Sequence, residues 1–133
     1  MRAIRRSGER GFTLVEMMIV VSMLAILVGI ALPQFRVSMI SAREAVLKED
    51  LFRFREAIDQ YHADKGVYPA SLQALVDEGY LRKLQADPMT QAVDWVEVMA
   101  EATEDNPDEA PGVYDVHSAS TETSLSGEPY SEW

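Results

Sequence analysis

The sequence predicts an α+β protein: a long, kinked N-terminal helix with a short helix and a small antiparallel sheet packed on its outer half. Three observations predict this fold. Residues 12–35 form a nearly unbroken apolar run, apolar residues then recur at helical spacing as far as Tyr61, and two short segments near residues 93–99 and 112–118 are rich in β-formers. Since few apolar residues follow the helix, the rest of the chain must borrow the helical surface to make a core.

Charge divides the 133 residues into three parts. Residues 1–11 hold four arginines and one glutamate, residues 12–35 hold only Glu16, and residues 36–133 hold 8 basic and 20 acidic side chains, for a net charge of −10 overall. This balance excludes a nucleic-acid-binding protein, which needs a basic face to displace counterions from phosphates. The absence of cysteine excludes disulfides and thiolate metal sites.

The apolar run at residues 12–35 is long enough to cross a membrane. As a helix it extends about 36 Å, against about 30 Å for the hydrocarbon core of a bilayer. The arginine-rich flank predicts a cytoplasmic N-terminus, so we expect a single-pass inner-membrane protein with a periplasmic C-terminal domain. A secretory signal peptide fits poorly, because no small-x-small cleavage site closes the run.

Glu16 is the one charge within this run. An ionised carboxylate in lipid costs about 2.5 kcal/mol or more. Either Glu16 is tolerated near the interface by snorkelling, or it pairs with a cation when the helix leaves lipid for a protein environment. An α-amino group created by removal of the basic segment next to Phe12 is such a cation.

The segment R-G-F-T-L-V-E at positions 10–16, followed by the apolar run, resembles the class III signal of type IV pilins and type II secretion pseudopilins. The resemblance implies cleavage by a prepilin peptidase between Gly11 and Phe12, methylation of the new N-terminus of Phe12, and pairing of Glu16 with the α-amine of a neighbouring Phe12 during assembly. It divides the chain into a leader at residues 1–11, which is removed, a transmembrane and filament-core helix at 12–35, and a periplasmic globular domain at 36–133.

Gly29 and Pro33 are expected to destabilise the helix near the C-terminal end of the apolar run. Proline lacks the backbone N–H donor, and glycine has a low helix propensity. One interpretation is a membrane helix whose backbone groups are satisfied locally. The other, which the resemblance supports, is that Pro33 is a built-in kink used in filament assembly.

An apolar stripe continues the helix to about residue 63, where Gly66 suits a left-handed cap and Pro69 forbids continuation. The stripe is formed by Val37, Ile40, Leu47, Leu51, Phe54, Ile58 and Tyr61. We expect the C-terminal part of the chain to fold back across it.

Beyond this helix, Ser71 is placed to cap a short helix that ends at Gly79. Residues 93–99 and 112–118 are the predicted strands, and the second has Tyr114 and Val116 on one face, with Asp115 and His117 on the other. The acidic segment 101–111 is expected to be an exposed loop, and residues 119–133 an irregular tail from which Trp133 docks back.

The segment Y-H-A-D-K-G-V-Y-P at positions 61–69 is similar to the corresponding stretch of G-type major pseudopilins of type II secretion. Tyr80, the Asp87-Pro88 turn, Trp95 and Trp133 also follow that family's order. The resemblance implies a structural subunit that polymerises through its N-terminal helices into a periplasmic pseudopilus, with an inner-membrane assembly platform and minor pseudopilins as partners. Two alternatives stay open: a type IV pilus subunit, and a membrane-tethered periplasmic protein that does not polymerise.

The G-type family typically has a C-terminal loop that binds calcium, and here the sequence departs from it. The tail holds Glu122 and Glu128 but no aspartate, with Ser120, Ser124 and Ser126 as further oxygen donors. Calcium takes six to eight oxygen ligands, usually including several carboxylates. The tail is therefore either a solvated segment without a metal or a calcium site that uses Glu122 and Glu128.

No pattern of catalytic residues stands out, and we expect neither an enzyme nor a bound organic cofactor. His62 and His117 alone make a poor zinc site. Ser118, Ser120 and Ser124 show no nucleophile-elbow pattern.

Overall fold

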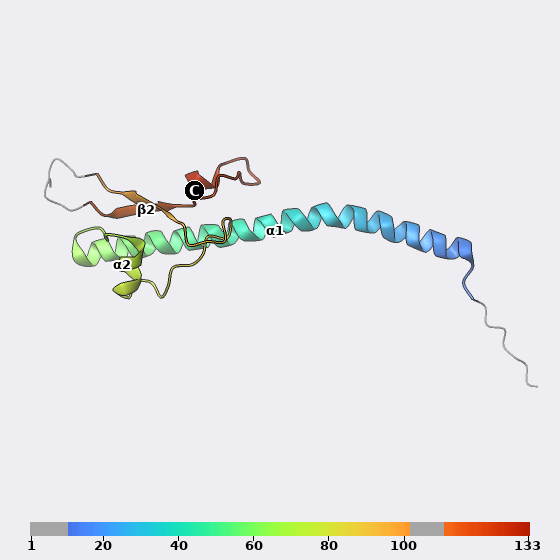
Figure 1. Ribbon diagram of the computed structural model, residues 1–133, viewed down its shortest axis with the longest axis horizontal. Helices are drawn as coiled ribbons and strands as arrows, with labels where there is room; N and C mark the ends of the chain where they lie inside the picture. The colour runs from blue at the N-terminus through green and yellow to red at the C-terminus, as the bar shows by residue number, and fades with distance from the viewer. Residues whose placement is uncertain (1–10, 102–110) are drawn as a thin grey trace, which may run out of the picture. The chain divides into compact units, whose positions relative to one another are not determined.

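The computed structural model describes residues 11–101 and 111–133, and these residues divide into two compact units between Val37 and Ser38. We call residues 38–133 the body. The elements in chain order are α1 (Leu14–Lys65), α2 (Leu72–Asp77), β1 (Val96–Met99), β2 (Val113–His117) and the 3₁₀ turn η1 (Tyr130–Glu132) (Figure 1). The predicted α+β class, with one long helix, a short helix and a small antiparallel sheet, is confirmed.

Helix α1 has 52 residues, and it begins and ends about two positions later than predicted. At its start, the Oγ1 atom of Thr13 accepts the N–H of Glu16 at 3.2 Å, which satisfies one of the free donors of the first turn. Pro33 lies inside α1, with helical residues on both sides. At its end, Gly66 has φ +72° and donates its N–H to the carbonyl of His62 at 2.8 Å, as predicted for a left-handed cap.

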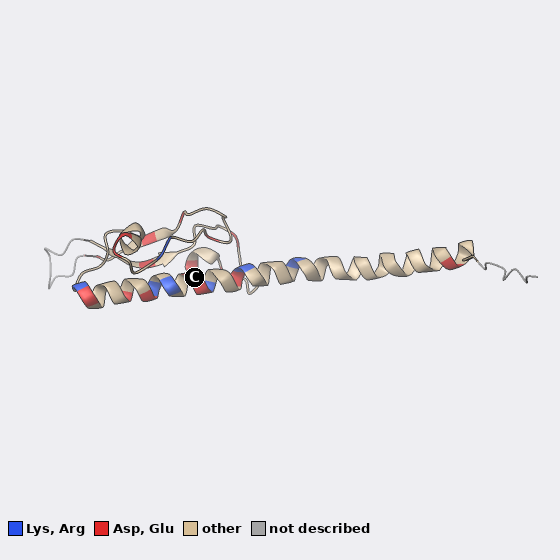
Figure 2. Ribbon diagram, turned by 90° about the horizontal axis from the view of Figure 1, so that it is seen from below, with Lys and Arg blue, Asp and Glu red and all other residues tan. Residues whose placement is uncertain are grey.

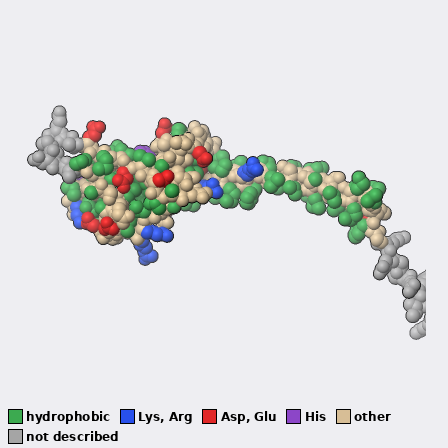
Figure 3. Space-filling model, in the orientation of Figure 1, with side chains coloured by type: hydrophobic (Ala, Val, Ile, Leu, Met, Phe, Trp, Pro, Cys, Tyr) green, Lys and Arg blue, Asp and Glu red, His purple; other side chains and the backbone are tan. Residues whose placement is uncertain are grey.

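The first 24 residues of α1 form a continuous apolar surface. The large apolar side chains from Phe12 to Val37 are exposed, with Leu14 at 80% and Ile30 at 68%. Figure 3 shows hydrophobic side chains over much of the visible face of this segment, and Figure 2 shows that the charges of α1 gather in the half nearer its C-terminus. By length and composition, this is a helix that could cross a membrane.

The core of the body forms on the C-terminal half of α1, along which α2 and β2 lie (Figures 1 and 2). The helix contributes a stripe at steps of three and four residues, the spacing of one helical face. The buried apolar residues are Leu47, Leu51, Phe54, Ala57, Ile58 and Tyr61 of α1, Leu72 and Leu75 of α2, Val113 and Val116 of β2, and Tyr130 of η1.

The predicted stripe was wrong at its N-terminal end. Val37 is 46% exposed and Ile40 is 38% exposed, whereas Leu47 is fully buried. The spacing of apolar residues identifies the correct face of α1 but does not say how far along that face the rest of the chain extends.

Strands β1 and β2 pair antiparallel, with Glu97 opposite Val116 and Met99 opposite Val113. The register shifts between Val98 and Met99, so Tyr114 has no partner across the ladder. This β-bulge places both Val113 and Val116 in the core and leaves Tyr114 exposed, which overturns the predicted grouping of Tyr114 with Val116.

Helix α2 is capped as predicted, since the Oγ atom of Ser71 accepts the N–H of Ala74 at 3.2 Å. The N–H of Leu72 donates to a carboxylate oxygen of Glu97 at 2.8 Å, which ties α2 to β1. The turn at Asp87 is also present, but its role is larger than predicted. The Asp87 side chain is fully buried, where it accepts the N–H of Met89 at 2.7 Å and the hydroxyl of Ser118.

Arg55 of α1 joins the helix, β2 and the C-terminal turn. Its Nε atom donates to Asp115 at 2.7 Å, and its second terminal nitrogen donates to the carbonyl oxygens of Val116 at 3.2 Å and Trp133 at 2.6 Å. Burial raises the pKa of the Asp115 carboxyl, but hydrogen bonds from Arg55 and from the N–H of Val116 outweigh it and hold that pKa below its usual 3.8.

Three other sequence expectations concern the acidic loop and the C-terminal tail. Trp133 docks back as predicted and is half-buried against the core. The tail is less irregular than expected, because it holds η1 and an isolated antiparallel bridge between Thr123 and Pro129. Of the predicted acidic loop 101–111, residues 102–110 lie outside the described residues.

Gly112 should not tolerate a side chain. A Cβ atom placed there lies 2.5 Å from the Cβ of Tyr68 and 2.7 Å from the Tyr68 carbonyl oxygen. We expect Gly112→Ala to lower the free energy of unfolding of the body by about 1–3 kcal/mol, measured by tryptophan fluorescence in urea. Gly29→Ala, at a position with no atoms within 4 Å, is the matched control. Equal stability of the two variants would contradict this packing.

The Arg55–Asp115 pair predicts a pH-dependent contribution to stability. Because folding lowers the pKa of Asp115, its contribution is present above about pH 4 and is lost as pH falls through the folded-state pKa. At pH 7 we expect Asp115→Asn to cost about 1–2 kcal/mol in urea unfolding, with the gap to wild type narrowing as pH falls below about 4. Glu49→Gln, which breaks the exposed Glu49–Arg53 pair, should change little. A gap that stays constant between pH 7 and pH 3 would rule out the charge of Asp115 as its cause.

Candidate functional site

The predicted cleavage position lies in an exposed, non-helical segment immediately before α1. Gly11 and Phe12 precede the helix, no atom lies within 4 Å of a Cβ built at Gly11, and Phe12 is 79% exposed. A peptidase needs an accessible peptide bond outside regular secondary structure, and the bond between these residues has both properties. The remainder of the predicted leader, residues 1–10, lies outside the described residues.

Glu16 lies in the first turn of α1, four residues after Phe12. Its backbone N–H is capped by Thr13, while its exposed carboxylate has no hydrogen-bond or ion-pair partner among the described residues. A negative charge in this turn is favoured by the helix dipole. Within the described residues, the carboxylate is therefore available to a further partner.

Pro33 creates a local defect in the hydrogen bonding of α1. Because proline has no N–H, the carbonyl of Gly29, four residues earlier, lacks the donor that an ordinary helical residue provides. Glycine at that position also has the highest backbone entropy to lose in a helix. Gly29 and Pro33 together therefore make the weakest turn of the apolar segment, although α1 is continuous through it.

The tail residues considered as calcium ligands form a closed loop with its own hydrogen bonds. The N–H of Ser124 donates to the carbonyl of Glu128 at 2.8 Å, the N–H of Gly127 donates to the carbonyl of Ser124 at 3.0 Å, and the N–H of Tyr130 donates to the carbonyl of Glu122 at 3.1 Å. The Oγ atom of Ser120 accepts the N–H of Glu122, and that of Ser124 accepts the N–H of Glu128. Several hydroxyl and carbonyl oxygens of the tail therefore already accept hydrogen bonds within the loop.

These residues do not fit a calcium site. The side chains of Glu122 and Glu128 are exposed, and the described part of the chain contains no group of three or more acidic or histidine side chains placed to hold a metal ion. Calcium needs a convergent set of oxygens, with several carboxylates among them. The carboxylates of the loop do not converge on one point, and several of its hydroxyl and carbonyl oxygens already accept hydrogen bonds within the loop.

Sequence reasoning missed the side chain that holds this loop. One carboxylate oxygen of Glu44, on α1, accepts the N–H of Leu125 at 2.8 Å and the hydroxyl of Tyr130 at 2.9 Å. Burial, with the hydrogen bond to Glu44, raises the pKa of Tyr130 to about 12. A signal was present, because Glu44 precedes Leu47 by three residues and so lies on the buried face of α1.

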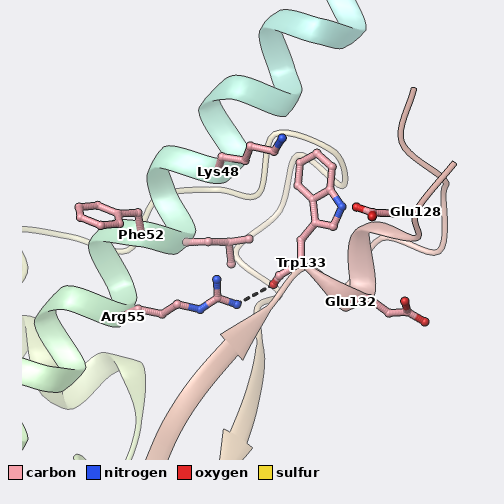
Figure 4. Close-up of a pocket in the computed structure, with 7 residues that line it drawn as sticks. Lys48, Phe52, Arg55, Glu128, Glu132 and Trp133 are labelled. Carbon is pink, nitrogen blue, oxygen red and sulfur yellow. Dashed lines mark hydrogen bonds between the residues drawn. The ribbon is translucent and has the colours of Figure 1, made fainter. Parts of the chain in front are cut away.

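A cleft of about 430 Å³ lies beside the tail, lined by residues that include Lys48, Phe52, Arg55, Glu128 and Trp133 (Figure 4). The ammonium group of Lys48 lies 4.5 Å from the centre of the Trp133 ring, and Arg55 donates to the Trp133 carbonyl. This arrangement fixes the end of the described chain and contains no nucleophile beside a base.

The histidines and serines that were weighed as catalytic groups have structural contacts. His62 stacks on Tyr68 with ring centres 4.2 Å apart. The Nδ1 atom of His117 lies 3.0 Å from the carbonyl oxygen of Trp133. Ser118 is buried and donates to Asp87.

Comparison with known proteins is consistent with the N-terminal motif. The family model described as the prokaryotic N-terminal methylation motif matches residues 6–32. The type II secretion system core protein G of Pseudomonas aeruginosa is 35% identical over 100 residues, covering 63% of this chain and 70% of that protein. The protein of the same name from Klebsiella michiganensis is 31% identical, with the same coverage.

A pilus protein also matches, over a shorter stretch. The fimbrial protein EcpC of Eikenella corrodens is 36% identical over 62 residues, which cover 47% of this chain and 40% of that protein. No solved structure matches the chain. The matches to core protein G therefore extend further along the chain than this match to a pilus subunit.

Proposed function

Because this chain belongs to the family of type II secretion system core protein G, we propose that it is a pseudopilin, a structural subunit that polymerises into a periplasmic pseudopilus driving type II protein secretion. The observation that carries the proposal is the combination of the methylation motif with similarity that reaches well into the body. The chain acts mechanically, not catalytically.

The proposed first step is processing. A prepilin peptidase removes residues 1–11 and methylates the new N-terminus at Phe12. The exposed, non-helical position of Gly11 and Phe12 supports this, since the bond between them is accessible without unwinding α1. Before assembly, residues 12–35 cross the inner membrane with residues 36–133 in the periplasm.

The proposed second step is assembly, in which the apolar surface of residues 12–35 leaves lipid and packs against the same surface of other copies. The carboxylate of Glu16 then pairs with the α-amino group of a neighbouring Phe12. Two properties support this role: the side chain is exposed and has no partner among the described residues, and an unpaired carboxylate in an apolar filament core carries a large desolvation cost. Extraction from the membrane is assigned to an inner-membrane assembly platform, and minor pseudopilins are the proposed companion subunits.

Pro33 is proposed to let α1 bend or locally unwind when the apolar segments pack together. The missing donor for the Gly29 carbonyl supports this role, because the turn between these residues has less hydrogen bonding to lose than its neighbours.

The alternative of a type IV pilus subunit shares the same processing and the same use of Glu16. The similarity to the fimbrial protein is confined to 62 residues, whereas the similarity to core protein G spans 100. This difference in extent favours the secretion pseudopilin over the pilus subunit.

Mass spectrometry of the mature N-terminus tests the processing step. We expect protein co-expressed with a prepilin peptidase to begin at Phe12 and to carry one N-terminal methyl group. Protein made without the peptidase should retain Met1. An unprocessed Met1 in both samples, or a cut at another bond, would remove the basis for the assembly role of Glu16.

Replacement of Glu16 tests the assembly step. We expect Glu16→Ala and Glu16→Gln to insert into the membrane normally but to reduce cross-linked oligomers at least about tenfold, because removing one partner of a buried charge pair costs about 2–5 kcal/mol. Thr13→Ala, which removes the capping hydroxyl but keeps the carboxylate, is the matched control. Oligomer yields for the Glu16 variants that equal the control would exclude the proposed charge pair.

A further inference from the structure

The tail after β2 is held to α1 by side chains of the helix at two points. Near the tip of the loop, Glu44 accepts hydrogen bonds from Leu125 and Tyr130. At Trp133, Arg55 donates to the backbone carbonyl, and Lys48 lies over the indole ring (Figure 4). Both attachments join residues about eighty positions apart, and neither uses a metal ion.

The first attachment is organised by the carboxylate of Glu44. A calcium ion could not take the place of this carboxylate, because the groups bound to it are hydrogen-bond donors. Calcium organises a loop by drawing oxygens inward. Here the organising group is an anion, and the N–H of Leu125 and the O–H of Tyr130 point toward one carboxylate oxygen at 2.8 and 2.9 Å. A cation that took this oxygen of Glu44 would have to displace both donors and leave the buried Tyr130 hydroxyl without its acceptor.

Serine side chains complete the loop without a metal. The hydroxyl of Ser118 accepts the N–H of Ser120, the hydroxyl of Ser120 accepts the N–H of Glu122, and the hydroxyl of Ser124 accepts the N–H of Glu128. All three serines are buried. Such side-chain bonds to nearby N–H groups stabilise turns. They leave the carboxylates of Glu122 and Glu128 in solvent.

We propose that Glu44 is the anchor of the C-terminal tail and that it replaces, in this chain, the calcium ion implied by the resemblance to G-type pseudopilins. The tail then folds in the same way whether calcium is present or chelated. This inference concerns the folding of the body alone and stands apart from polymerisation.

Amide hydrogen exchange of the full-length chain in detergent micelles, followed by mass spectrometry, tests the anchor. The wild type is compared in millimolar calcium chloride and in excess chelator, and exchange of residues 121–133 should be the same in both. Glu44→Ala should speed exchange in this segment at least about tenfold under both conditions and leave α2 and β1 unchanged. Glu44→Gln should give a smaller effect, because its amide oxygen still accepts a hydrogen bond.

The matched controls separate the anchor from a metal site. The double variant Glu122→Gln/Glu128→Gln removes both candidate calcium carboxylates and should behave as wild type, as should Glu49→Ala on the exposed face of α1. If Glu44→Ala disrupts the whole body, Tyr130→Phe removes one of the two bonds and should still speed exchange of the tail. Slower exchange of the wild-type tail in calcium than in chelator, loosening by the double variant, or an unchanged tail in both the Glu44→Ala and Tyr130→Phe proteins would each overturn the proposal.

Discussion

The elements that follow α1 depend on a surface that they do not themselves provide: the buried stripe of α1 between Leu47 and Tyr61. Helix α2 has six residues and the sheet has two short strands, and elements of this size do not bury enough apolar area to be stable alone. Helix α2, β2 and η1 contribute buried residues to the core on this helical face, and β1 is held by its pairing with β2. The tail obeys the same constraint through Glu44 and Arg55.

The N-terminal and C-terminal parts of α1 therefore have surfaces that suit different surroundings. From Phe12 to Val37 its large apolar side chains stay exposed, which suits a segment whose surroundings are lipid or other copies of itself. From Leu47 onward most apolar residues lie on one buried face and most charges lie outside it, which suits a segment covered by its own chain on one side and by water on the other. The change of pattern along α1 marks the change of environment.

Much of this fold could be predicted because its signals are local. The helical stripe, the cap at Gly66 and the N-cap at Ser71 depend on residues within a few positions of one another. The bulge at Tyr114 was not predictable, because it reflects how β1 and β2 align across a long connection. The contacts of Glu44 and Arg55 were likewise not predicted, since their partners lie 60 to 86 positions away.

The assembly motif could be recognised from sequence because its residues are adjacent, but the structure adds a contrast between two carboxylates of the same helix. Glu44 finds its donors within the chain and thereby shapes the body. Glu16 has no partner among the described residues and lies where the surrounding side chains are apolar. A carboxylate already satisfied within its own chain gains little from a second copy, whereas one left without a donor in apolar surroundings is stabilised only when another molecule supplies a cation. In the proposed assembly, the same chemical group therefore serves folding at Glu44 and association at Glu16, and the availability of an internal donor decides which.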